Sequence, residues 1–302
     1  MPMSIRVLTV LSVLIASTAA VPAQARGVLN VATGAVNGTY ATMFKNMGQV
    51  CTAASWLKER HTSGSIENVD LLLANQASLA FVQLDVLKAR QQIDHDPRTD
   101  AVRTRLPLHR EELHLLALQP QKAGGFLGPR ARMSGPKTFT DLAGASMGAW
   151  GGSVVTARVL TAVSGVACTV RAFKDRDSAL FALRDHQVAA VLAVVGQPAA
   201  WVSGLDPAVY ALLPIDGKVR HPDFYAPANL LYSGFGSATP TLSVQSVLAT
   251  RDFKSPDKRK QLLTYYACLE THLTQLPEDE GVHPKWQDIK SFSGPVPWPA
   301  LK

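Results

Sequence analysis

The sequence predicts an α/β protein of two lobes, each a mostly parallel sheet flanked by helices. Short apolar runs that are typical of buried strands alternate with helical patterns along most of the chain. A glycine-containing loop joins a strand to a helix twice, at residues 32–40 and 151–153. The order of helix end, polar turn and apolar strand at residues 73–83 recurs at residues 183–193. Such recurrence is also common in unduplicated α/β folds, so it indicates a similar plan and not a duplication.

The first half begins with a predicted strand at residues 28–33, the glycine loop and a helix at residues 40–58. A second helix at residues 66–75 and buried strands at residues 79–82 and 113–118 follow. The densest basic segment, residues 98–110, is expected to be a solvated helix face and loop, and nucleic acid is not expected as a partner.

The second half repeats this plan. It has a predicted strand at residues 145–150, a helix at residues 154–164, a helix at residues 177–183 and a strand at residues 188–195. A strand near residues 241–250 returns, a helix at residues 259–273 follows, and a proline-rich tail holds Trp286 and Trp298, which should pin it against a lobe. We expect residues 26–119 plus 244–302 to form the first lobe and residues 120–243 the second.

Residues 1–25 have the pattern of a secretory signal peptide. A charged start leads into the apolar residues 7–20, and Ala23-Gln24-Ala25 matches a small-residue cleavage site. Cleavage after Ala25 would leave a protein exported to the periplasm, with a retained membrane anchor as the alternative. The net charge of +7 comes from scattered Lys and Arg residues and favours acidic ligands through the overall field.

The three cysteines, Cys51, Cys168 and Cys268, permit one disulfide in an exported chain, with three possible pairings. Cys51–Cys268 is slightly favoured, because both residues lie in helical patterns assigned to the same lobe. Cys168 is expected to be a buried small hydrophobic residue. No Cys or His spacing indicates a zinc site, so we expect no metal.

The loop ATGAVNGTY, residues 32–40, has the features of an anion-binding site. It lacks the Lys-Ser/Thr of a nucleotide-binding loop and the GxGxxG spacing. A helix that starts after this loop would offer free N–H groups to a carboxylate or phosphate, with Asn37 and Thr39 as side-chain donors. The alternative is a tight turn that needs glycine for its backbone conformation.

Further candidates follow other strands or open other helices, at the sheet edge where ligands of parallel sheets bind. Gln83 and Asp85 would either contact a ligand or tie down the next loop. Ser65 is expected to cap a helix, which leaves Ser63 and Gly64 for a cleft. Ser153 lacks the following glycine of a hydrolase nucleophile and has no evident His/Asp partners, so no catalytic residue is expected. The predicted ligand-binding residues are Asn37, Gly38, Thr39, Tyr40, Ser63, Gln83, Trp150, Gly152, Ser153 and Gln197.

These segments together resemble the TAXI family, the TRAP-associated extracytoplasmic immunogenic solute receptors. Residues 32–40 resemble its G-[ST]-G-x-x-G-G-T-Y loop, with Ala32 and Asn37 as departures. Residues 62–69 are similar to T-G-G-S-V-E-N-L, and residues 82–86 to V-Q-S-D-V. Where the family has G-S-G-T, this chain has Gly151-Gly152-Ser153-Val154, and the loss of two hydroxyl groups should change which ligand fits.

The resemblance implies a type II periplasmic binding protein fold without a cofactor. It also implies a small carboxylate or amino-acid ligand such as glutamate, and the membrane subunits of a TRAP transporter as partners. A periplasmic sensor or accessory protein without a transporter is the first alternative. An exported enzyme that uses the same cleft is the second.

Overall fold

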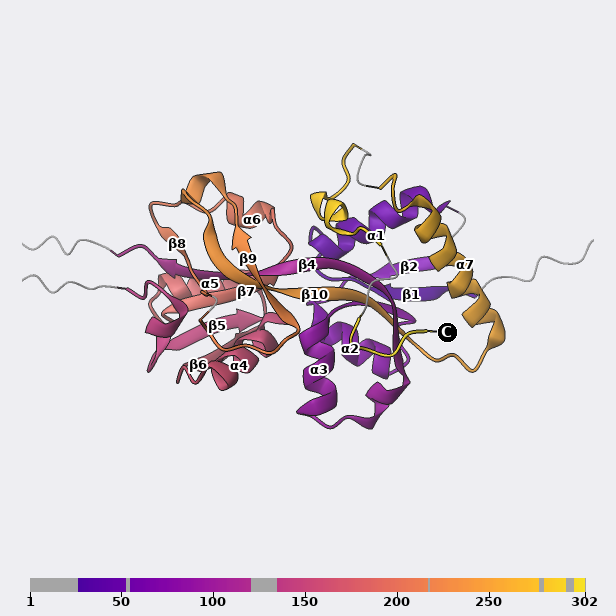
Figure 1. Cartoon of the computed structure of the whole chain (residues 1–302), viewed down its shortest axis with the longest axis horizontal. Coiled ribbons are helices and arrows are strands. Elements are labelled where there is room, and N and C mark those ends of the chain that lie inside the picture. The colour runs from indigo at the N-terminus through magenta and orange to yellow at the C-terminus, as the bar shows by residue number, and fades with distance from the viewer. Residues whose placement is uncertain are drawn as a thin grey trace, which may run out of the picture.

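The computed structural model describes residues 27–52, 55–120, 135–216, 218–276, 280–291 and 296–301. The predicted signal peptide lies outside these residues. Two α/β lobes lie side by side, and two long strands, β4 (Val102–Leu118) and β10 (Thr239–Arg251), cross from one to the other (Figure 1). The two-lobed α/β fold predicted from the sequence is therefore confirmed.

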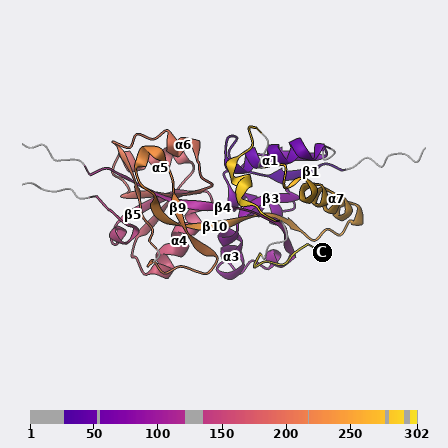
Figure 2. The ribbon, with the colours of Figure 1, turned by 45° about the horizontal axis from the view of Figure 1, so that its top comes forward.

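The first lobe holds the N-terminal strands and helices and the C-terminal helix α7 (Pro256–His272). They lie on the same side of the molecule in Figure 2. Its elements besides β4 and β10 are β1 (Leu29–Ala32), α1 (Thr39–Val50), β2 (Leu57–Arg60), α2 (Ser65–Leu73), β3 (Leu79–Gln83), α3 (Leu84–Gln92), η2 (Pro97–Ala101), α7 (Pro256–His272) and η5 (Pro284–Asp288).

The second lobe is built from the middle of the chain. Its elements are η3 (Phe139–Leu142), β5 (Ser146–Trp150), α4 (Ser153–Ser164), β6 (Thr169–Phe173), α5 (Arg176–Arg184), β7 (Ala190–Val195), α6 (Ala200–Ser203), β8 (Tyr210–Leu213), β9 (Tyr225–Leu230) and η4 (Ser233–Phe235).

One sheet runs through both lobes in the order β2-β1-β3-β10-β4-β7-β5-β6, with β8 on β4 and β9 on β10. The pairs β1–β2, β1–β3, β5–β6 and β5–β7 are parallel, as expected, whereas β4 and β10 pair antiparallel with their neighbours. β4 changes partner from β10 to β7 at Glu112. The point where the chain crosses between the lobes therefore lies inside a strand, next to Glu111.

The strand β3 shows how the core is divided by the sheet. Leu79 and Phe81 pack with α1 and α7, while Ala80 and Val82 face the cluster that contains α2 and α3. Alternation on a strand sends successive side chains to opposite faces. The α2–α3 cluster continues into α4 of the second lobe, so the lobes share apolar contacts on that side.

Several predicted elements need correction. The helix expected to reach residue 58 ends at Val50, and residues 57–60 form the edge strand β2, whose polar sequence conceals it. The basic segment at residues 98–110 is not a solvated helix face: Leu106, Leu108 and His109 are buried in β4. The helix α3 and the strand β6 were not predicted. Cys168 is partly exposed and not buried.

The C-terminal tail packs back on the first lobe through its two tryptophans. Trp286 is fully buried beside α1 and α7 and donates to Asn46 Oδ1 at 3.3 Å. Trp298 is buried and donates to the Val102 carbonyl oxygen at 3.1 Å. Both contacts agree with the anchoring role expected from the sequence.

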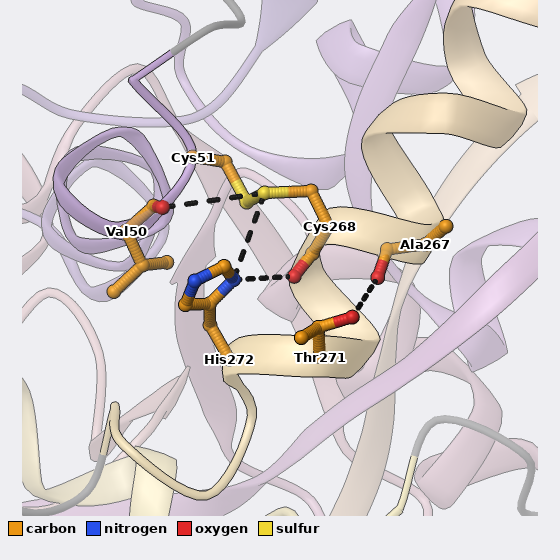
Figure 3. Close-up of a disulfide and its surroundings, with 6 residues drawn as sticks. All are labelled: Val50, Cys51, Ala267, Cys268, Thr271 and His272. Carbon is orange, nitrogen blue, oxygen red and sulfur yellow. Dashed lines mark hydrogen bonds between the residues drawn. A yellow bond between two sulfur atoms is a disulfide. The ribbon is translucent and has the colours of Figure 1, made fainter.

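A disulfide joins the end of α1 to α7 (Figure 3). It connects Cys51 and Cys268, whose Cα atoms are 6.1 Å apart and which are separated by 217 residues in the sequence. This is the pairing that the sequence favours. His272, one turn further along α7, bonds through Nδ1 with the carbonyl oxygen of Cys268 (Figure 3). Within the described residues, no helix has the length and apolarity to cross a membrane.

Candidate functional site

A cavity of about 130 Å³ lies where the two lobes meet. Both predicted glycine loops line it, together with the loop that opens α2 and the ends of β3 and β7. The lining residues are Gly34, Ala35, Gly38, Thr39, Tyr40, Ser63, Gly64, Ser65, Gln83, Glu111, Trp150, Gly151, Gly152, Ser153, Val194 and Val195. Loops far apart in the sequence thus converge on one space.

Two helices begin at this cavity without a capping side chain. α1 has Gly38 as its N-cap and α4 has Gly152, and neither cap residue can offer a side-chain oxygen to the first N–H groups. A turn closed by the Gly38 N–H and the Ala35 carbonyl oxygen, 2.8 Å apart, brings the chain into α1. In α4 the N–H groups of Val154 and Val155 already bond to the carbonyl oxygens of Gly151 and Gly152, at 3.2 and 3.0 Å, so this helix can offer a ligand only the N–H groups before them. Helix N-termini carry partial positive charge, so both starts suit an anionic group.

Glycine at the second turn permits the close approach of the lobes. Gly151 has a φ of +50°, and a Cβ there would lie 2.5 Å from the Ser63 carbonyl oxygen. A Cβ on Gly152 would fall on the side-chain oxygen of Gln83. Gly64, with a φ of +118°, would place its Cβ 3.8 Å from the Gly152 nitrogen. Side chains at Gly151 and Gly152 would therefore hold the cleft open, whereas a Cβ on Gly64 would make an ordinary contact and glycine is favoured there by the positive φ.

The first-lobe wall carries hydroxyl and amide groups. Gln83 is 3% exposed, and among the described residues its side-chain amide has no hydrogen-bond partner. Ser63 donates its hydroxyl to Glu67 at 2.8 Å. The Ser65 hydroxyl accepts from the Gln83 N–H at 3.0 Å, and Gly64 is the N-cap of α2, so the expected capping role of Ser65 is wrong. The positive φ at residue 64 moves the helix start by one residue.

Glu111 is a cavity residue that sequence reasoning missed. It is 4% exposed, and its Oε2 accepts from the Tyr40 hydroxyl at 2.5 Å. Burial raises the pKa of Glu111 to about 8, against the opposing effect of the Tyr40 hydrogen bond. The surrounding sequence HREELH does not predict that Glu111 lies in a cleft, because this position depends on which strands pair with β4.

The sequence allows Gln83 and Asp85 either to contact a ligand or to tie down a loop, and the structure gives Asp85 a tethering role. Its Oδ2 accepts from the Thr156 hydroxyl at 2.5 Å and from the Tyr225 hydroxyl at 2.7 Å, both in the second lobe. Burial raises the pKa of Asp85, while these two hydrogen bonds lower it. Asp85 therefore ties the lobes together, and Gln83 faces the cavity.

A buried charged group lies beside the point where β4 crosses. Lys285 Nζ contacts Glu112 Oε1 at 2.5 Å and Asp288 Oδ2 at 2.7 Å. Burial alone would lower the pKa of Lys285, but the two carboxylates raise it overall. Burial and Lys285 together hold the pKa of His109 well below its usual value, so this imidazole stays neutral.

The structure brings together every predicted ligand-binding residue except Asn37 and Gln197. Asn37 is exposed and does not line the cavity. Gln197 donates to the Asn229 carbonyl oxygen at 2.8 Å and accepts from the Leu231 N–H at 2.9 Å, which fixes a loop of the second lobe. Ser153 lines the cavity, and its hydroxyl accepts from the Val194 N–H at 2.9 Å.

One group of described residues has metal-ligand spacing, Cys51, Cys268 and His272. The two sulfur atoms are joined in the disulfide (Figure 3), so they are not thiolate ligands. None of these three residues lines the cavity between the lobes.

Solved structures of binding proteins share the fold of this chain. An arginine-specific periplasmic binding protein of Salmonella typhimurium superposes with a TM-score of 0.52 at 16% identity, over 89% of this chain and 100% of that chain. Tv2483, solved with L-arginine bound, gives a TM-score of 0.52 at 12% identity over 87% of this chain and 90% of that chain. The chain therefore has the two-lobed fold of periplasmic binding proteins.

The sequence profile of the NMT1-like family matches residues 31–266, and the chain belongs to this family. The match begins in β1 and ends in α7, so it includes every loop that lines the cavity. A comparison with curated proteins gives no match.

Proposed function

We propose that the chain is an extracytoplasmic receptor that captures a small organic acid or amino acid by closure of its two lobes. The observation that carries this proposal is the convergence of two uncapped helix N-termini, one from each lobe, on one cavity. Each supplies N–H donors to a carboxylate, and the site is complete only when the lobes meet.

The finer parts of the proposal rest on sequence features. The motifs shared with TAXI receptors support a TRAP-type transporter as the partner that receives the ligand. The signal-like pattern of residues 1–25 supports export to the periplasm, with cleavage after Ala25. We propose a division into residues 26–119 plus 244–302 and residues 120–243, with β4 and β10 as the connecting strands. A binding role without catalysis fits a cavity in which the one carboxylic acid among the described lining residues, Glu111, pairs with a tyrosine.

A thermal-shift screen of carboxylates and amino acids tests the receptor function. A ligand present at a hundred times its dissociation constant should stabilise the chain by about 2.7 kcal/mol, which raises the melting temperature by several degrees. Gln83, Thr39 and Tyr40 are proposed to contact the ligand. For Asn37 and Gln197, ligand contact is proposed only in a form of the protein in which the two lobes are further apart. Absence of any shift, together with turnover of an ester or glycoside, would replace the receptor by the enzyme alternative.

A further inference from the structure

The ionisable groups of the cavity are unusual for a site that binds an anion. Among the described residues that line it there is no lysine and no arginine, and the one carboxylic acid is Glu111. In its ionised form this buried acid would repel an anion at short range, since charge interactions strengthen away from water. Helix N-termini alone would have to hold a dicarboxylate against this acid.

Glu111 keeps one oxygen available. Oε2 is occupied by the Tyr40 hydroxyl, whereas the nearest charged or imidazole group recorded for Oε1 is His109 Nε2, at 4.0 Å, beyond hydrogen-bond range. A carboxylate can accept several hydrogen bonds, so Oε1 retains acceptor capacity. His109 stays neutral because of burial and the nearby Lys285, so it does not neutralise Glu111.

The rest of the wall limits the ligand's size and its side chain. The cavity of about 130 Å³ is well below the size of sites for drug-sized ligands. Trp150, Val194 and Val195 supply an apolar side. A long ligand side chain would find little room, and an acidic one would find no lysine or arginine among the described lining residues.

We propose that the ligand is a small zwitterionic amino acid with an uncharged side chain. Its ammonium group donates to Glu111, and its carboxylate accepts from the N–H groups that start α1 and α4. The proposal rests on the receptor function proposed above and narrows it, because it excludes dicarboxylates and simple monocarboxylates. It also gives the acid of β4 a direct role in recognition.

Protons should take part in binding. The ionisable groups that face Glu111 come from four elements. Two of these groups, Asp85 and Glu112, raise the pKa of Glu111 and so favour its neutral form. Among the described residues these groups are Tyr40 of α1, Asp85 of α3, His109 and Glu112 of β4, and Lys285 of η5. Since the pKa of free Glu111 is about 8, an ammonium ligand must displace a proton at neutral pH. Affinity should therefore rise with pH, by at most about tenfold per unit, up to about pH 8.

The test compares amino acids with hydroxy acids of the same shape. Glycine, L-alanine and L-serine are titrated by calorimetry into the purified chain beside glycolate, L-lactate and L-glycerate, at pH 6 and pH 8, with L-glutamate as the dicarboxylate. We expect at least one amino acid to bind about 10- to 100-fold more tightly than its hydroxy acid, as loss of a charged hydrogen bond predicts. Its binding should be tighter at pH 8 and should release protons.

Substitution locates the effect. Glu111→Gln should reduce the preference for the amino acid about tenfold or more and remove the proton release, and Glu111→Asp should retain both in part. The control Asp177→Asn changes an exposed acid of α5 and should alter neither. If Glu111→Gln does not fold, the comparison of amino acids with hydroxy acids on the unaltered chain still tests the proposal.

Two results would overturn the inference while leaving the receptor function intact. One is equal or tighter binding of a hydroxy acid or of L-glutamate. The other is affinity that rises as the pH falls, because a protonated Glu111 would then be donating to a ligand carboxylate. If no carboxylate or amino acid of the wider screen binds, the receptor function itself fails.

Discussion

The two walls of the cleft differ in kind. The first-lobe wall presents hydroxyl, amide and carboxylic acid groups, and Gln83 has no protein partner for its side chain among the described residues. The second-lobe wall presents Trp150, two valines and two glycines, and the Ser153 hydroxyl is already bonded within its own lobe. The first lobe thus supplies most of the specific polar contacts, and the second supplies shape and backbone.

This difference suggests an order of events. A ligand would contact the first lobe, which is fixed by a disulfide and by the buried tail, and the second lobe would then close over it. The Asp85 contacts with Thr156 and Tyr225 hold the lobes together once they meet. Four experiments test this comparison, and they follow in order of expected effect.

Replacement of Cys51 and Cys268 by serine should cause the largest loss of stability. The disulfide joins two helices of the first lobe and closes a loop, 217 residues long in sequence separation, that includes the second lobe. Removal of such a bond costs about 2–5 kcal/mol of unfolding free energy. Chemical denaturation measures it. Cys168→Ser, in the second lobe, is the matched control and should change stability little. An equal loss in both variants would contradict the idea that the first lobe is the one stabilised by a cross-link.

Gly151→Ala should weaken ligand binding by about 10- to 100-fold. The new Cβ would meet the Ser63 carbonyl oxygen across the cleft, and overpacking of this kind costs about 1–3 kcal/mol. Gly165→Ala is the control, since Gly165 also has a positive φ, of 75°, but its Cβ would meet no atom within 4 Å. Calorimetric titration with the ligand found by the screen separates closure from backbone strain. Equal effects of the two substitutions would show that strain alone is responsible.

Gln83→Leu should weaken binding by about tenfold, because one hydrogen bond to the ligand is lost from the polar wall. The exposed Gln187 of the second lobe gives the control, Gln187→Leu, with no expected change in affinity. The same titration measures both. Unchanged affinity in Gln83→Leu would mean that the first-lobe amide fills space without contacting the ligand.

The smallest effect, taken per pH unit, is the change in stability with pH in the absence of ligand. The pKa of Glu111 is about 8 in the fold and near 4.5 in the unfolded chain, so the fold binds more protons between these values. Stability therefore falls as pH rises through this range, by at most about 1.4 kcal/mol per unit. The buried neutral His109 has the opposite effect below pH 6.5, so the interval from pH 6.5 to 8 isolates the carboxylic acids. Urea unfolding should show a flatter slope in Glu111→Gln, and an unchanged slope would assign the effect to Asp85 or Glu112.

Regular patterns made part of the site predictable. Loops after β1 and β5 were identified by their glycines, and Gln83 by its place directly after a buried strand, because parallel strands direct such residues to one edge. The sequence does not predict the edge strand β2 and predicts only the end of the long strand β4, because charged residues in both strands hide the alternation of apolar and polar side chains. Gln197 was placed by analogy with Gln83, but its side chain serves a loop.

The sequence by itself determined the two-lobed α/β fold and the glycine turns, because the spacing of apolar and turn residues dictates strands, helices and their connections locally. Only the tertiary structure decided that Glu111 reaches the cavity and that Asp85 joins the lobes. Both depend on which strands and helices become neighbours, a matter of packing between residues more than 70 positions apart for Tyr40–Glu111 and Asp85–Thr156. Local sequence carries no record of such distant partners.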